Sequence, residues 1–205
     1  IPSQLQLHEN RFVLSDIDPK ARFRNYESAF FWLYDSRIVN IAYNTFAPTI
    51  GLVMNTERST LRCYLADTGL LVSLAFGERG QMPVEVYERL LHDKLESNMG
   101  MVMENIVAQM LMAAGHKLFF YNHIDRKDAS NDMEIDFLIT KSIITSRKNI
   151  CPIEVKSSTS FTITSLEKCM SKFNQSIGHA YVLHTGDVQL TDKITYLPLY
   201  MTGLL

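Results

Sequence analysis

The sequence predicts an α/β (α+β) fold with a mixed sheet flanked by helices. In the second half of the chain, the hydrophobic periodicity changes in the order helix, strand, strand, strand, helix, strand. The 205 residues are 46% apolar and 20% charged, which is enough apolar material for a substantial core. We expect two regions, residues 1–98 and 99–205. Their boundary is predicted within residues 77–101, where a charged helical stretch, Val84 to Glu96, separates them.

The first region begins with a predicted helix and continues with two strands. Apolar residues recur at helical spacing from Ala21 to Tyr34, and Ile38 to Tyr43 reads as a strand. Pro48 and Gly51 mark a loop before a second strand, Leu61 to Leu65. One helix followed by two strands is typical of a winged-helix half. A small α+β lobe without DNA contacts explains the pattern equally well.

The second region begins with a helix that Gly115 ends. The remaining elements follow at short intervals, and their predicted ranges are helix 100–114, strands 117–121, 133–140 and 150–156, helix 165–173 and strand 179–184. This αβββαβ order is the core order of the restriction-endonuclease-like fold.

The composition excludes several classes of protein. Lys plus Arg is 20 and Asp plus Glu is 22, so the net charge of −2 produces no general attraction to nucleic acid or membranes. Three cysteines without a CxxC motif argue against a disulfide scaffold or a cysteine zinc site. No apolar run reaches the ~18 residues of a membrane span. We therefore expect a cytoplasmic protein, and its start at Ile1 suggests a piece excised from a longer one.

Two predicted strands carry the residues with catalytic potential. Successive strand side chains point to opposite faces, so Glu134 and Asp136 share one face, as do Glu154 and Lys156. The opposite faces are apolar, with Ile135, Phe137 and Ile139 on the first strand and Cys151, Ile153 and Val155 on the second. If the strands pair with these apolar faces aligned, Asp136, Glu154 and Lys156 converge.

Glu104 is a third candidate acid, because Val107, Ala108 and Leu111 form an apolar stripe on its side of the helix. Carboxylates hold Mg²⁺ or Mn²⁺, which can activate a water for phosphodiester hydrolysis. The alternative is a structural ion pair of Lys156 with Glu154 or Asp136.

Other motifs support neither a zinc nor a serine hydrolase, because the sequence has no H-E-x-x-H and no G-x-S-x-G. Basic residues in predicted loops lie beside the proposed site and are either solvated or contact phosphate: Arg126, Lys127, Lys141, Arg147 and Lys148.

At these positions the sequence resembles the PD-(D/E)XK nuclease superfamily, with Glu104 as its helix acid, Asp136 as its strand acid and Glu154-Val155-Lys156 as its E-x-K. The sequence around these motifs resembles the uncharacterised C-terminal domain of prokaryotic AAA+-type ATPases. The segments that carry this resemblance are 104–109 (ENIVAQ), 134–139 (EIDFLI), 152–157 (PIEVKS), 64–71 (YLADTGLL) and 196–200 (YLPLY).

The resemblance implies an ATPase domain before Ile1, which would hold the ATP, since this chain has no P-loop motif. It also implies a metal-dependent nuclease-like domain that cleaves DNA. Asp136 and Glu154 would bind Mg²⁺ or Mn²⁺, Glu104 would be a third ligand or a water-orienting base, and Lys156 would stabilise charge on the water or phosphate. The alternative is a catalytically silent module that binds nucleic acid or docks a protein for the ATPase.

Overall fold

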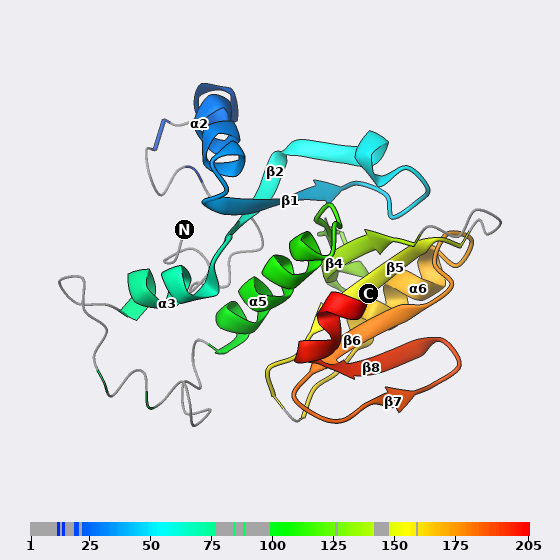
Figure 1. Cartoon of the computed structure of the whole chain (residues 1–205). Coiled ribbons are helices and arrows are strands. Elements are labelled where there is room, and N and C mark those ends of the chain that lie inside the picture. The colour runs from blue at the N-terminus through cyan, green and yellow to red at the C-terminus, as the bar shows by residue number, and fades with distance from the viewer. Residues whose placement is uncertain are drawn as a thin grey trace.

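A computed structural model describes residues 12, 14, 19–20, 22–76, 84, 88, 99–125, 127–141, 148–158 and 160–205. The predicted α/β class is confirmed, because eight strands of this part form one mixed sheet with helices packed on it (Figure 1). The strand order is β2-β1-β3-β4-β5-β6-β8-β7. Among the described residues, no helix has the length and apolar character needed to cross a membrane.

Strand directions alternate at first and then become parallel. The antiparallel pairs are β1/β2, β3/β4, β4/β5 and β7/β8, and the parallel pairs are β1/β3, β5/β6 and β6/β8. The strands are β1 (Val39–Thr45), β2 (Thr56–Leu65), β3 (Phe119–His123), β4 (Met133–Thr140), β5 (Ile150–Val155), β6 (Ala180–His184), β7 (Gln189–Leu190) and β8 (Ile194–Pro198).

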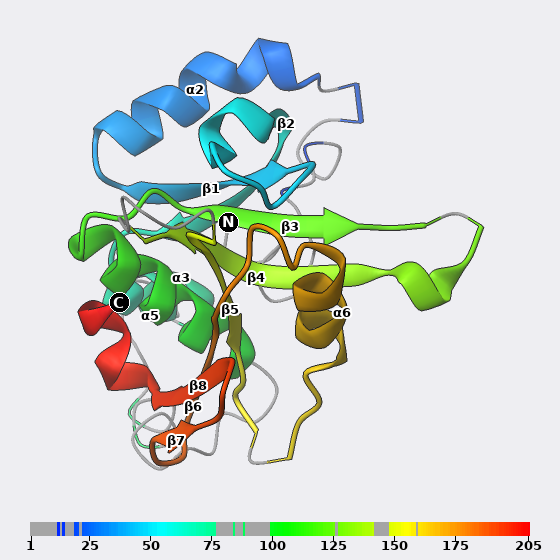
Figure 2. The ribbon, with the colours of Figure 1, turned by 90° about the vertical axis from the view of Figure 1, so that its right-hand side faces the viewer.

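Helices cover both faces of the sheet (Figure 2). α5 (Met99–Ala113) and the C-terminal 3₁₀ helix (Leu199–Leu204) pack on one face, where Val107 and Leu111 meet Phe120, Phe137 and other strand residues. α6 (Thr164–Lys172) packs on the other face. α5 ends where Gly115 takes a φ of +92°, a conformation that favours glycine.

The first predicted region adds two strands to the edge of the same sheet, because β1 pairs with β3 as well as with β2. α2 (Phe23–Asp35) and α3 (Thr68–Phe76) pack with the start of α5 around a third apolar cluster, which includes Phe30, Leu71 and Met101. A short 3₁₀ helix, Leu52–Asn55, precedes β2, and another, Ala129–Asn131, precedes β4. The predicted helical stretch 84–96 lies outside the described residues apart from Val84 and Glu88.

One predicted alternation is wrong in part. Phe119 pairs with Leu138 and Tyr121 pairs with Ile135, so two steps along β3 match three steps along β4. This bulge places Asp136 and Phe137 on the α5 side, while Ile135 packs in the cluster beneath α6. The predicted common face of Ile135 and Phe137 therefore does not form, although Glu134 and Asp136 do point the same way, toward Arg62.

Candidate functional site

The centre of the candidate site is a buried arginine. The side chain of Arg62, on β2, is 6% exposed, and its guanidinium lies 4.5 Å from the centre of the Phe120 ring. It is hydrogen-bonded to Glu134. One of its terminal nitrogens also lies 3.9 Å from Asp136 Oδ1 and 4.0 Å from Glu104 Oε2. Arg62 therefore joins three acids from α5 and β4.

The alternation of β2 brings Arg62 to this position. Leu61, Cys63 and Leu65 pack into the cluster beneath α2 and α3, so Arg62 and Tyr64 face α5. The Tyr64 hydroxyl donates a hydrogen bond of 3.1 Å to Glu104 Oε2. Glu104 is thus held by two residues of the first region.

Polar residues of α5 secure the same connection. The side chain of Asn105 is fully buried; its Oδ1 accepts a hydrogen bond from the Leu65 N–H at 2.8 Å and its Nδ2 donates to the Leu65 carbonyl at 3.0 Å. The Gln109 side-chain oxygen accepts from the N–H and hydroxyl of Thr68 at 3.0 and 2.8 Å. The ENIVAQ segment therefore positions Glu104 by binding the end of β2 and the start of α3.

Asp136 lies where β4 separates from β5. The β4–β5 pairing covers only residues 137–140 of β4, so the strands diverge at Asp136. Asp136 Oδ2 accepts a hydrogen bond of 2.7 Å from the N–H of Val155, whereas Oδ1 faces Arg62. The carboxylate therefore fills the gap between the two strands.

Glu154 and Lys156 form a second charged group. Lys156 Nζ lies 2.7 Å from Glu154 Oε1, and the Glu154 side chain is 8% exposed. Within the described part, Glu154 Oε2 is buried and accepts no hydrogen bond. This oxygen is an acceptor available to a cation or a donor group.

His184 belongs to the same face and was missing from the predicted site. Glu154 pairs with Val182 in the parallel register, so His184 lies two residues further along β6 on that face. Its Nδ1 accepts a hydrogen bond of 3.1 Å from the Gly186 N–H, which places the proton of a neutral ring on Nε2. Nε2 is buried and has no partner among the described residues.

Burial raises the pKa of every acid in the site. The pKa of Glu104 rises to about 7, first because of burial and then because of Asp136, against the opposing effects of Arg62 and Tyr64. Burial also raises the pKa of Asp136, Glu134 and Glu154, and nearby cations oppose the shift. Lys156 acts on both Asp136 and Glu154, so the two charged groups are electrostatically connected.

Burial alone would lower the pKa of Arg62, but Tyr64, Glu104 and Asp136 more than offset this and keep the guanidinium charged. The two groups contain the acids Glu104, Glu134, Asp136 and Glu154 and the cations Arg62 and Lys156. When every acid is ionised, anions outnumber cations by two.

The acids of the site are of the kind that magnesium and manganese ions bind, since both ions prefer carboxylate oxygens. No group of three or more His, Cys, Asp or Glu side chains in the described ranges is arranged to hold a metal. Mg²⁺, however, is usually bound by one or two carboxylates, with waters and phosphate as its other ligands. Asp136 and Glu154 each offer one carboxylate, but from different sides of the sheet: Asp136 faces Arg62 on the α5 side, whereas Glu154 shares the face of Val182 beneath α6.

Of the predicted site residues, Glu104 and Asp136 share Arg62 on the α5 side of the sheet, whereas Glu154 and Lys156 bind each other on the other side. The predicted convergence of Asp136 with Glu154 and Lys156 on one face is therefore wrong, because the bulge in β4 turns Asp136 to the side of Phe137. Sequence reasoning missed the roles of Arg62 and Tyr64. The available signal was the alternation of β2, which places an arginine and a tyrosine opposite three apolar residues.

Of the basic loop residues, Arg126 and Arg147 lie outside the described part. Lys141 contacts the Tyr181 hydroxyl and lies 4.6 Å from the centre of that ring, so its charge is held against the sheet.

The fold and site therefore define a mixed α/β protein with a buried acidic cluster organised by one arginine. A family model described as a domain of unknown function, DUF4143, matches residues 99–201, and the chain belongs to this family. Searches of curated proteins and of solved structures give no significant match. Glu104, Asp136, Glu154 and Lys156 lie within the matched segment, whereas Arg62 and Tyr64 lie before it.

Proposed function

We propose that this chain is the C-terminal part of a prokaryotic, cytoplasmic AAA+-type ATPase and carries a metal-dependent nuclease-like site of the PD-(D/E)XK type. The observation that carries the proposal is that Asp136, in the gap between β4 and β5, accepts a hydrogen bond from the N–H of Val155, the residue between the ion-paired Glu154 and Lys156. The element order α5-β3-β4-β5-α6-β6 supports a restriction-endonuclease-like core, and it is the order expected from the sequence. DNA is the proposed substrate.

In this proposal, Asp136 and Glu154 would hold Mg²⁺ or Mn²⁺ once the Glu154 side chain turns toward the gap between β4 and β5. The ion would supply a water of lowered pKa and positive charge for the phosphate. The hydrogen bond from Val155 fixes Asp136, so its carboxylate needs no reorganisation. Lys156 binds Glu154 and its charge also lowers the pKa of Asp136, so it is the proposed group that stabilises negative charge on the attacking water or the phosphate.

Glu104 is the proposed base that orients water. Its pKa of about 7 lets it accept a proton near neutral pH. Tyr64 and Arg62 hold one of its oxygens and are positioning residues in this scheme. The sequence-based alternative, in which Glu104 is a third metal ligand, is less favoured. The same nitrogen of Arg62 lies 4.0 Å from Glu104 and 3.9 Å from Asp136, so a positive charge already occupies the place between these two acids.

A second function is favoured by one observation. Arg62 already provides a buried positive charge to three acids, as expected of an ion-paired scaffold. In that case the domain is catalytically silent and serves the ATPase as a nucleic-acid-binding or protein-docking module.

Cleavage assays separate the two functions. The chain is incubated with Mn²⁺ or Mg²⁺ and single- or double-stranded DNA, alongside Asp136→Ala and Lys156→Ala variants. Asp192→Ala is the matched control, because Asp192 is an exposed acid in the β7–β8 connection. Metal-dependent cleavage that both site variants lose and the control keeps supports the nuclease. Cleavage that survives Asp136→Ala contradicts the site assignment, and no cleavage by the unaltered chain favours the silent module.

A further inference from the structure

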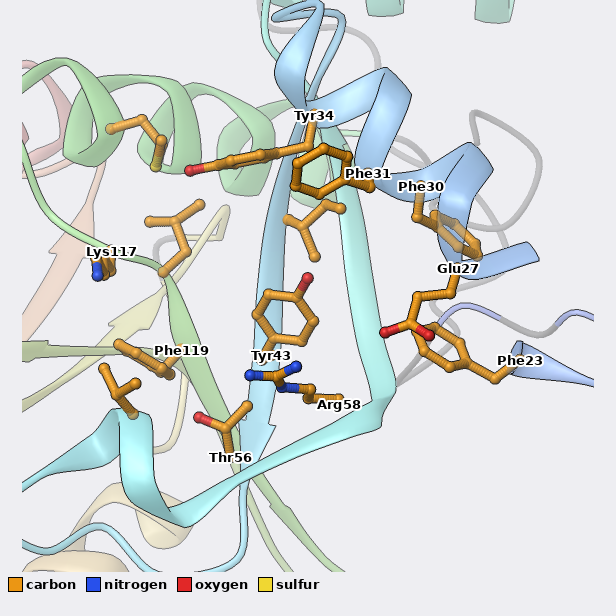
Figure 3. A pocket seen from close by; sticks show the side chains of 14 residues that line it. Phe23, Glu27, Phe30, Phe31, Tyr34, Tyr43, Thr56, Arg58, Lys117 and Phe119 are labelled. Atoms are coloured by element: carbon orange, nitrogen blue, oxygen red, sulfur yellow. The ribbon is translucent and has the colours of Figure 1, made fainter. Parts of the chain in front are cut away.

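The sheet face opposite the acidic cluster borders an aromatic cavity. The cavity has a volume of about 330 Å³ and lies between α2, β1, β2 and the start of β3 (Figure 3). Ile41, Tyr43 and Phe119 line it, whereas their neighbours Ala42 and Phe120 point to the α5 side. A cavity of this size is within the range of small-ligand sites. It is separate from the proposed nuclease site, so its function does not depend on that proposal.

Aromatic rings border the cavity from two directions. α2 contributes Phe31 and Tyr34, and the sheet contributes Tyr43 and Phe119 (Figure 3). Phe31 is 67% exposed, so its ring is accessible to a ligand in the cavity. A flat aromatic ligand placed here would contact rings on both sides. Stacking of bases on aromatic side chains is a common source of affinity in proteins that bind single strands.

The polar groups of the cavity favour an anionic ligand. Arg58 reaches from β2 toward the ring of Tyr43, and Lys117 lies at the other side of the cavity from Glu27 (Figure 3). Neither Arg58 nor Lys117 forms an ion pair with another described residue. The positive charge of Arg58 lowers the pKa of the Tyr43 hydroxyl, against the larger effect of burial. Two cations against one carboxylate leave a net positive charge.

We propose that this cavity binds a nucleotide, with the base between the rings of α2 and those of the sheet and the phosphate directed to Arg58 and Lys117. Glu27, at the side away from Lys117, is then placed to accept a hydrogen bond from an amino group of the base, since a carboxylate pairs with such donors. The ligand could be a free nucleotide or the phosphorylated 5′ end of a single strand, because both present the same base and phosphate.

Titration calorimetry on the whole chain tests the proposal with three probes: deoxyadenosine monophosphate, deoxyadenosine and a 5′-phosphorylated oligodeoxyadenylate. The variants are Arg58→Ala and Phe31→Ala. Lys193→Ala is the control, because Lys193 is an exposed cation in the β7–β8 connection. Charge-assisted contacts and stacking each predict at least about a tenfold loss of affinity in the two cavity variants and none in the control. Deoxyadenosine should bind at least about tenfold more weakly than its monophosphate.

Binding of the mononucleotide identifies a free nucleotide as sufficient, and binding of the oligonucleotide alone identifies a strand end. Both results support the proposal when Arg58→Ala and Phe31→Ala weaken binding. The proposal is overturned if neither phosphate-bearing probe binds, or if binding is the same in the cavity variants as in the control. Because Asp136 lies on the other side of the sheet, an Asp136→Ala variant should bind the nucleotide normally even if the nuclease proposal fails.

Discussion

Replacing Arg62 by methionine tests how the acidic cluster is held. Methionine keeps most of the contact with Phe120 but removes the charge that faces Glu104, Glu134 and Asp136. Removing one partner of a buried ion pair costs about 3–5 kcal/mol, because the remaining charges are left without compensation. For a chain of this size, that loss lowers the melting temperature by roughly 6–20 °C.

The sign of the pH dependence follows from the same cluster. Without Arg62, which lowers the pKa of the acids, their folded-state pKa values rise further above those of the unfolded chain. The variant should then lose most stability near pH 8, where the acids must ionise, and less near pH 5, where they are protonated.

Urea unfolding followed by circular dichroism at both pH values measures the difference. Arg58→Met is the matched control, because Arg58 is an exposed arginine on the same strand, and its effect should stay within about 0.5 kcal/mol. A loss below about 1 kcal/mol at pH 8, or an equal loss at both pH values, would refute the reasoning.

Three further predictions concern the same core. Glu104→Gln should flatten the dependence of the unfolding free energy on pH. Because burial raises the Glu104 pKa to about 7, the unaltered chain should lose up to about 3 kcal/mol of unfolding free energy as pH rises from 4.5 to 7, and urea unfolding of the variant should show a smaller loss. A profile as steep as before would contradict the assignment of that pKa. Asn105→Ala should lower the unfolding free energy by about 2–4 kcal/mol, because it leaves the N–H and the carbonyl of Leu65 unpaired. The control Asn174→Ala, at an exposed position, should lower it by less than about 0.5 kcal/mol. Equal effects of the two changes would show that Asn105 does not secure the end of β2. Lys156→Met should lower the unfolding free energy by about 1–3 kcal/mol, because it leaves Glu154 without its partner. In a double-mutant cycle with Glu154→Gln, the loss in the double variant should be at least about 1 kcal/mol smaller than the sum of the two single losses. Strictly additive losses would mean that the pair is not coupled.

The local elements could be predicted from periodicity because each has its own apolar pattern. The strand predicted over 133–140 coincides with β4, and the helix predicted over 100–114 differs from α5 by one residue at each end. β8 and the C-terminal 3₁₀ helix were not predicted. β8 (Ile194–Pro198) pairs with β6 along its whole length, but three of its residues are half-buried and the last two are buried. Exposed and buried positions therefore do not alternate along β8, and the sequence pattern does not mark it as a strand.

All the site residues predicted from the sequence lie in the second region, residues 99–205, whereas Arg62 and Tyr64 lie in the first. Glu134 and Asp136 share a direction as expected, but the bulge that moves Asp136 into the gap between the strands is a break in periodicity. The contact of Arg62 with Glu134 spans 72 residues and depends on β1 pairing with β3, a non-local parallel pairing that periodicity does not encode. The alternation of each strand therefore indicated which way Glu134, Asp136 and Arg62 point, but not that Arg62 of the first region meets the two acids of β4.

The most direct test of the central claim is a calorimetric titration of Mn²⁺ into the chain, with Asp136→Asn and Asp192→Asn measured beside it. The account predicts that the unaltered chain and the Asp192 variant bind Mn²⁺ alike, and that Asp136→Asn weakens binding by at least about tenfold while remaining folded. No binding to the unaltered chain, or equal binding to all three, would contradict a metal site at Asp136 and Glu154.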